Sequence, residues 1–409
     1  MDNLTHSLVG LAIGEASYQL QISRREADSF RRRLLWVSSL IASNLPDADS
    51  LWVPLLGGGK LRYLLQHRGY SHTLIGVVPQ LLVVMFLIWL FLKLTKRKLL
   101  LGDWYIVGLT GVIGLVVHIF LDFVGSYGVH PFWPWSGRWV YGDAIFIVEP
   151  FVWCSLLPWL FFSTRKIGKW LIGALQLAAI GLCVYSGIVP GLMVGVLIVW
   201  ASGLWLTSVF LMDKQRIMLA LGVCVSVFVV FFYIHQVVYR YTTAKAYSLF
   251  PKAELHDVIL SPLPANPLCW QLILVQTEGS AYLMRKGFVA PMPAVLEASS
   301  CVALWSTQAS SILRPMDQME NPHMKWVGEF RGSVMDFRRI AKLREPSLFL
   351  RFSRAPFWIS LGNNVVLGDL RFHRGSTQGF SVVEVETEPA SFPAEGPNWI
   401  PPRSDILKE

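Results

Sequence analysis

Long apolar runs constrain the fold of this chain more than any other feature of its sequence. A membrane-spanning helix needs about 20 apolar residues. Six runs meet or approach that length, the one at 145–162 being the shortest: 74–92, 104–124, 145–162, 169–187, 189–211 and 217–238. Two weaker runs, 4–20 and 34–45, precede them and could be short spans or partly embedded helices. Only 15% of the residues are charged, against about 25% in soluble proteins. Residues 1–238 are therefore predicted to form an α-helical polytopic membrane bundle of about six to eight membrane helices.

The basic residues predict which way the bundle faces, because positive charge concentrates in the cytoplasmic loops of membrane proteins. Here it forms four clusters between apolar runs: Arg24, Arg25, Arg31, Arg32 and Arg33; Lys93, Lys96, Arg97 and Lys98; Arg165, Lys166 and Lys169; and Lys214 and Arg216. Alternating passage through the membrane places all four on one side, provided that 4–20 and 34–45 also cross or reach in from opposite faces. The loops 46–73 and 125–144, and all of residues 239–409, are then predicted to be extracytoplasmic.

Residues 239–409 change character and predict a small, mainly antiparallel β (α+β) domain with one or two helices. Alternating apolar and polar residues bounded by turn residues are typical of strands. Two strands are expected in 271–284 around a Gly-Ser turn, two or three in 348–372 around a GNN turn, and one in 379–389. The best helix candidate is 292–308, and the Pro-rich segment 391–409 is expected to be extended.

The net charge of +9 does not indicate a nucleic-acid partner. Residues 239–409 hold 18 Lys and Arg against 16 Asp and Glu, so most of the excess lies in short loops of the helical half. There it acts as a topology signal.

The five cysteines indicate whether part of the chain is exported to an oxidising compartment. Cys154, Cys183 and Cys224 lie in apolar runs, where thiols commonly pack as small apolar groups. Only Cys269 and Cys301 could form the disulfide of an exported domain, and their spacing does not require one. No CxxC motif is present, so no thiolate zinc site is predicted. The opening MDNLTHSLVG lacks a basic region, so we expect no cleavable signal peptide.

Histidines and acidic residues gather on the predicted outer side of the helical half. They stand at the ends of apolar runs or in the loops between them: His6, Asp47, Asp49, His67, His72, His118, Asp122, His130, Asp143 and Glu149. The topology was assigned from Lys and Arg alone, so this coincidence is independent of it. Because ionisable groups are costly at membrane depth unless they are paired or functional, a shared metal site is the leading hypothesis.

The spacings fit metal binding, although each motif alone has a simpler interpretation. His118 and Asp122 are four residues apart, so on a helix both point from one face, where they could bind one ion or form a buried hydrogen bond. His67 and His72 are five apart and would splay on a straight helix. Gly69 suggests a loop that could turn both inward, whereas loop histidines at an interface are otherwise solvated.

The remaining candidates also have two interpretations. Asp47 and Asp49 follow Pro46 and could simply form a turn or a helix start, and His6 could be a cap or a surface residue. Together, however, neutral imidazoles and ionised carboxylates suit zinc, or less specifically manganese or iron. Mixed sites of this kind with open positions are catalytic, because a bound water loses a proton near neutral pH and can attack an ester or phosphoester.

Taken in order, these motifs resemble a known family. TH at 5–6, NLPDAD at 44–49, HRGYSHT at 67–73, HIFLD at 118–122 and the later PFWPWSGRW and GDAIFIVEP look like the YdjM-type family of bacterial inner-membrane metal-dependent hydrolases. The match covers roughly residues 1–160, and SPLPANPLCW at 261–270 resembles the larger members. The order of His, Pro-Asp, His and HxxxD is more distantly similar to zinc-dependent phospholipases C. The resemblance implies a bacterial inner-membrane protein with a divalent metal site.

Resemblance and donor chemistry together imply a role for each candidate. The implied metal ligands are His6, Asp47, His67, His72, His118 and Asp122. Asp49 would not bind the metal itself but would orient one of the ligand histidines. Asp143 or Glu149 would act as general base; Glu149 stands where similar chains often carry an Asp. Arg68 could hold a phosphate or carboxylate group, or could instead extend to the lipid headgroups.

Three functions compete. The first is a divalent-metal hydrolase of the inner membrane, with zinc the expected ion, acting on a phosphoester or ester of a lipid or lipid-linked envelope substrate. Its site and residues 239–409 would face the periplasm. The second is a transporter or channel that relays protons or passes metal, which fits less well because the groups gather at one face. The third is a structural or regulatory membrane protein stabilised by metal. The hydrolase is the prediction carried forward.

Overall fold

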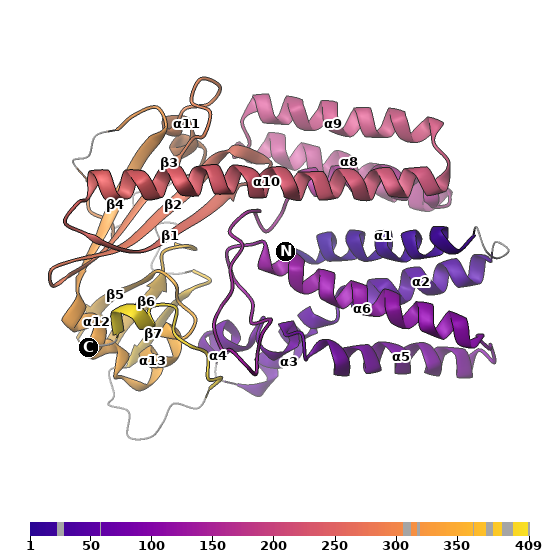
Figure 1. The fold of residues 1–409 in the computed structure, drawn as a ribbon, viewed down its shortest axis with the longest axis horizontal. Helices are drawn as coiled ribbons and strands as arrows, with labels where there is room; N and C mark the ends of the chain where they lie inside the picture. The colour runs from indigo at the N-terminus through magenta and orange to yellow at the C-terminus, as the bar shows by residue number, and fades with distance from the viewer. Residues whose placement is uncertain are drawn as a thin grey trace.

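The molecule is elongated, with a helical half at one end and a β-rich half at the other (Figure 1). The computed structural model describes residues 1–22, 28–57, 59–305, 312–316, 320–362, 364–373, 379–386 and 396–407. The helical half contains α1 (Asn3–Ile22), α2 (Ser29–Ala42), η1 (Pro46–Ala48), α3 (Asp49–Trp52), η2 (Val53–Leu56), α4 (Gly59–Gln66), η3 (Tyr70–His72), α5 (Val77–Leu94), α6 (Leu101–Phe123), α7 (Pro150–Ser163), α8 (Lys166–Ser186), α9 (Gly191–Phe210) and α10 (Asp213–Leu249).

Five of the described helices are long and apolar enough to cross a membrane: α5, α6, α8, α9 and α10. They coincide with five of the six predicted runs. The sixth run, 145–162, corresponds to α7, a shorter apolar helix that starts only at Pro150 because Glu149 caps its N-terminus. The two weak runs are α1 and α2, which pack against each other and against α6. The helical membrane architecture is thus confirmed.

The described basic clusters lie at one end of the bundle, as predicted. Arg97 lies over the ring of Phe30, 4.1 Å from its centroid, which places the loop between α5 and α6 beside the start of α2. An ion pair of 3.9 Å joins Arg32 of α2 to Asp213 at the start of α10. Arg216 of α10 lies 4.9 Å from the ring of Phe162 at the end of α7. Arg24 and Arg25 lie outside the described residues.

Helix α10 joins the two halves and runs across the boundary predicted at 238–239. It has 37 residues, so it is about 55 Å long. Its buried residues continue past the membrane-spanning part at helical spacing, through His235, Val238, Thr242 and Ala246. This second part of α10 lies along the first sheet (Figure 1). The helix therefore persists beyond the apolar run because a sheet replaces lipid as its partner.

The β-rich half contains two antiparallel sheets. The first has the order β1-β2-β3-β4, and the second β5-β6-β7. The predicted Gly-Ser and GNN turns are confirmed, since Gly279 and Gly362 have positive φ angles that favour glycine. The elements are β1 (Glu254–Leu263), β2 (Asn266–Glu278), β3 (Ala281–Val289), α11 (Ala298–Trp305), β4 (Met324–Ser333), α12 (Val334–Ala341), α13 (Arg344–Leu350), β5 (Pro356–Leu361), β6 (Asn364–Asp369), β7 (Val382–Glu386) and α14 (Ser404–Leu407).

Some details of this half were predicted wrongly. Leu348, Phe349 and Leu350 end α13 instead of forming a strand, because a short apolar run has the same appearance in a buried strand and a buried helix. β1 and β4 lie outside the predicted strands, and the described part contains four short helices. The segment expected to be extended includes α14. Parts of the predicted segments, 306–308, 363, 387–389, 391–395 and 408–409, lie outside the described residues.

A disulfide joins Cys269 of β2 to Cys301 of α11, which is the one pair considered possible from the sequence. The bond ties the helix to the first sheet. Cys154, Cys183 and Cys224 are buried free thiols, as expected.

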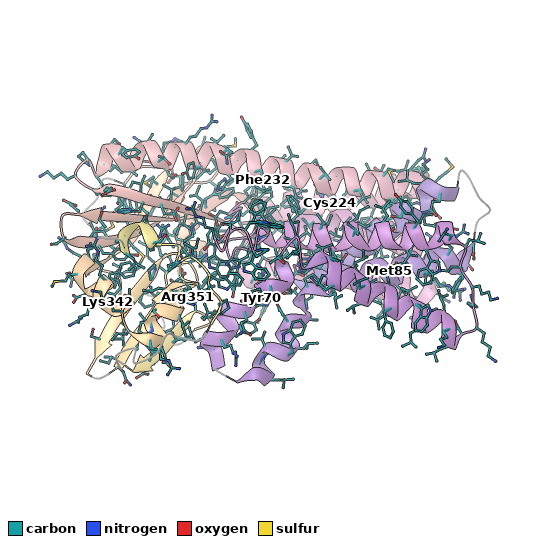
Figure 2. All side chains as sticks on the ribbon, turned by 60° about the horizontal axis from the view of Figure 1, so that its bottom comes forward. Tyr70, Met85, Cys224, Phe232, Lys342 and Arg351 are labelled. Atoms are coloured by element: carbon teal, nitrogen blue, oxygen red, sulfur yellow. A yellow bond between two sulfur atoms is a disulfide. The ribbon has the colours of Figure 1, made fainter. Side chains whose placement is uncertain are left out.

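The β-rich half packs against the loops of the helical half that contain Leu65 and Trp139. The indole of Trp139 donates to the carbonyl of Arg351 at 2.6 Å, and the indole of Trp399 donates to that of Leu65 at 2.7 Å. The Trp399 ring also lies 5.1 Å from that of Tyr70. Side chains fill this junction between the labelled Arg351 and Tyr70 (Figure 2). The C-terminal segment therefore helps to cover the region that contains the candidate site.

Candidate metal centre

Three elements bring histidines and carboxylates to one buried point. Asp47 comes from η1, His72 from η3, and His118 and Asp122 from consecutive turns of α6. Pro46 starts the short helix that carries Asp47, and the helical spacing of the α6 pair points both side chains the same way. All four residues are buried, and one ligand atom from each lies within 4.8 Å of the others. We call these four residues the His/Asp cluster.

The donor atoms of the cluster face one another. His72 Nε2 lies 2.9 Å from Asp122 Oδ2, 3.0 Å from His118 Nε2 and 3.3 Å from Asp47 Oδ1. His118 Nε2 lies 3.5 Å from Asp122 Oδ2 and 3.7 Å from Asp47 Oδ1. Two nitrogens and two carboxylate oxygens thus surround one small volume.

The cluster fits a divalent cation. Among the described residues, buried Asp47 Oδ1 and Asp122 Oδ2 make no aligned hydrogen bond. Two buried carboxylates so close together need compensating positive charge, of which the guanidinium of Arg68 and the amino group of Met1 supply part at Asp122. His118 Nδ1 lies 2.7 Å from the carbonyl of Ser43, to which it can donate, leaving Nε2 as the ligand nitrogen. A set of two imidazoles and two carboxylates suits zinc and other first-row metals.

His6 lies at the edge of the cluster. Its Nε2 is 3.3 Å from Asp122 Oδ1 and 4.0 Å from Asp47 Oδ2, and its ring stacks on that of His118 at 3.9 Å. Its buried Nδ1 has no hydrogen-bond partner among the described residues. The structure therefore brings His6 to the cluster without making it one of the four grouped residues.

His67 and Asp49 form a second group beside the first. His67 Nδ1 lies 2.8 Å from Asp49 Oδ1, and the three residues Asp47, Asp49 and His67 could also hold an ion. The hydroxyl of Ser71 donates to Asp49 at 2.7 Å. Burial raises the pKa of Asp49, but the hydrogen bond from His67 and the charge of His72 outweigh burial and hold this pKa below its ordinary value.

The end of helix α4 before Arg68 and Gly69 lets both histidines of HRGYSH point inward. α4 ends at Gln66, Arg68 has a φ of +59°, and its backbone N–H donates to Asp49 at 3.1 Å. The rings of His67 and His72 then lie 6.2 Å apart. On a straight helix the side chains of His67 and His72 would point apart, and the end of α4 before Arg68 avoids that arrangement.

The Arg68 side chain is buried, with only 4% of its surface exposed, so it does not extend to lipid headgroups. Its Nη2 lies 2.9 Å from Asp122 Oδ1, and its guanidinium lies 5.0 Å from the centroid of Tyr127. Its Nε has no hydrogen-bond partner among the described residues. A cation in this position can bind an anionic group next to the cluster.

The carboxylates of Asp143 and Glu149, the two residues suggested as general bases, have other partners. Asp143 pairs with Arg354 at 2.6 Å. Glu149 accepts from the backbone N–H of Phe151 at 3.1 Å and of Ala265 at 3.3 Å. Burial raises the pKa of Glu149 to about 8, although both N–H groups oppose the shift. These contacts give both carboxylates structural partners, and the general-base role suggested from the sequence stays a prediction.

A cavity of about 630 Å³ lies beside the cluster, between the two halves of the molecule. His67, Arg68 and Tyr63 line it from the helical half, and β1, Trp305 and the segment after β6 line it from the β-rich half. The sequence could not reveal this cavity, because its walls are more than 100 residues apart along the chain.

Fold and site together define a multi-pass helical membrane protein with a buried His/Asp cluster that could hold a metal ion. Residues 1–190 match the family described as YdjM inner membrane protein, which confirms the resemblance seen in the motifs. The chain is also 25% identical over 157 residues to a protein of Bacillus subtilis (strain 168) described as "Uncharacterized protein YfhP". That alignment covers 38% of this chain and 44% of the relative, so it spans less than half of either protein. No solved structure matches.

Proposed function

We propose that this protein is a divalent-metal-dependent hydrolase of the bacterial inner membrane, acting on a phosphoester or ester of a lipid or lipid-linked envelope substrate. The observation that carries the proposal is the convergence of two buried carboxylates, each with an oxygen that makes no aligned hydrogen bond, and two imidazole nitrogens beside a cavity. Burying such groups is costly unless a ligand compensates them.

His72, His118, Asp47 and Asp122 would hold the ion, with His6 at their edge. We expect zinc, with manganese or iron as alternatives. A bound ion of this kind supplies Lewis acidity and lowers the pKa of water to near neutrality.

The neighbouring residues position the substrate and the proton. Arg68 would bind an anionic oxygen of the substrate through the N–H groups that face away from Asp122. Asp49 accepts from Nδ1 of His67, so Nε2 is the nitrogen that His67 can offer to an ion or a proton. His67 also lines the cavity, and with Asp143 and Glu149 engaged elsewhere it becomes the base candidate that the geometry favours.

A lipid substrate is supported by the surface next to the site. The segment that carries Asp47 and Asp49 continues into exposed apolar side chains, Leu51 (75% exposed), Trp52 and Leu55 (84% exposed). Large exposed apolar side chains on a short helix suit the headgroup layer of a bilayer. The site would therefore lie where a membrane lipid could reach it.

Hydrolysis can be tested with the purified protein in detergent. Phospholipids and the soluble diester bis(p-nitrophenyl) phosphate would be offered with zinc or manganese. We expect metal-dependent turnover that a chelator abolishes and that Asp47→Ala lowers by at least about 100-fold. His323→Ala, a change in the β-rich half, is the control. A protein that holds its metal but turns over none of these compounds would contradict the proposal and favour a metal-stabilised structural or regulatory protein.

We propose a periplasmic location for the site and the β-rich half. It is supported by the basic clusters at the opposite end and by the Cys269–Cys301 disulfide, since such bonds persist in oxidising compartments.

Two exposed serine and threonine positions test this orientation. A membrane-impermeant maleimide added to cells with a permeabilised outer membrane is expected to label Ser360→Cys, in β5, and to leave Thr95→Cys, after α5, unlabelled. The three native thiols are buried, so they give little background. The reverse labelling pattern would place the site in the cytoplasm.

A further inference from the structure

We propose that the cavity between the two halves binds a phosphate-bearing membrane lipid, with the apolar chain held between apolar side chains of both halves and the anionic head at Arg68. The inference rests on the proposed function and deepens it, because it places the lipid in this cavity and gives the β-rich half a role in binding. A volume of about 630 Å³ lies within the usual range for small-molecule sites.

Much of the cavity wall is apolar. Ile147, Leu260 and Leu263 line it, together with Phe146 and Trp305, whose rings meet edge to face at 5.5 Å. These side chains come from the loop before α7, from β1 and from α11. Both halves therefore build the apolar wall, and neither alone would enclose a chain.

The apolar wall also lies close to the membrane-spanning region. Ile147 is half exposed and stands three residues before α7. Ala265, in the turn between β1 and β2, is buried in the core of the helical bundle. An acyl or isoprenoid chain could thus pass from the bilayer into the cavity without crossing open water.

The anionic head would lie where Arg68 borders the His/Asp cluster. Arg68 is buried, and its Nε lacks a hydrogen-bond partner among the described residues. A buried guanidinium group with an unmade hydrogen bond is costly, and a phosphate oxygen would supply the partner. Arg371 also borders the cavity, but it is held by Asp369 and the carbonyl of Ser126. Arg68 is therefore the better cation for a ligand.

A photoreactive lipid tests the inference directly. The full-length protein in detergent would be treated with a chelator, so that no turnover consumes the probe, and incubated with phosphatidic acid carrying a diazirine in its acyl chain. We expect labelled peptides that contain residues 145–147 or 259–263. Labelling confined to the lipid-facing sides of α5, α8 and α9 would overturn the inference.

Substitutions distinguish the cavity from general lipid contact. Ile147→Trp adds bulk at a half-exposed position, so the variant should fold, and it is expected to lower cavity labelling roughly tenfold. Leu361→Trp adds the same side chain at an exposed position in β5 and should leave labelling unchanged. Equal labelling of wild type and Ile147→Trp would also overturn the inference.

The outcome can be separated from that of the proposed function. Specific labelling of the cavity by a protein that hydrolyses nothing would support the lipid site and contradict the hydrolase. Metal-dependent hydrolysis of the soluble diester without cavity labelling would support the hydrolase and contradict the lipid site.

Discussion

After purification in detergent, the wild-type protein is expected to carry a metal ion that the His118→Ala/Asp122→Ala double variant lacks. The two residues contribute a nitrogen and an oxygen to a four-residue cluster. Removing a group that only hydrogen-bonds to a metal ligand lowers the affinity for the metal about 10- to 100-fold. Removing two ligands should therefore lower that affinity more than about 100-fold. Mass spectrometry of bound metals should find about one or two zinc or manganese ions per wild-type chain and none in the variant.

A matched control separates loss of ligands from loss of fold. His256 and Asp405 form another His–Asp pair, 3.1 Å apart, in the β-rich half, so His256→Ala/Asp405→Ala should keep its metal. Circular dichroism and gel filtration would show that each variant remains folded. A wild-type protein that is metal-free and takes up no metal on reconstitution would contradict the site, and would leave its histidines and aspartates as a proton path or a polar packing network.

Asp369→Ala is expected to destabilise the β-rich half by about 3–5 kcal/mol, because it leaves the buried guanidinium of Arg371 without its partner. Asp369 is fully buried and accepts hydrogen bonds from the hydroxyl of Ser353, the backbone N–H of Arg354 and the side chain of Arg371. Arg371 in turn donates to the carbonyl of Ser126 in the helical half at 2.6 Å. The loss of stability should appear as unfolding at a lower urea concentration than in the wild type. Tryptophan fluorescence of the full-length protein would monitor this unfolding.

A surface ion pair in the same half provides the comparison. Asp336 is 43% exposed on its side chain and pairs with Arg339 at 3.4 Å, so Asp336→Ala should change stability by less than about 1 kcal/mol. Equal effects of Asp369→Ala and Asp336→Ala would show that the Asp369–Arg371 pair is not a structural link between the halves.

The sequence predicted the membrane helices and the composition of the cluster well, because both depend on local patterns. Apolar length alone located α5, α6, α8, α9 and α10. The i,i+4 spacing of His118 and Asp122 placed both side chains on one face of α6, as the structure confirms. Topology from basic residues then brought the other histidines and aspartates to the same end.

Long-range partners are what the sequence could not show about Asp143 and Glu149. Asp143 pairs with Arg354, which is 211 residues away, and Glu149 meets Ala265, which is 116 residues away. Both carboxylates occur in a motif-rich region, so local reasoning grouped them with the site. Nothing in their own surroundings could show that another part of the chain would satisfy them.

The amino-acid sequence by itself determined which segments enter the membrane and which side chains can bind a metal, because hydrophobic length and donor chemistry are properties of short segments. The tertiary structure decided which donors meet, which of them are engaged elsewhere, and that a cavity lies between the halves. Those features depend on distances between residues far apart in the chain. They are set by how α6, the broken HRGYSH segment and the β-rich half pack together.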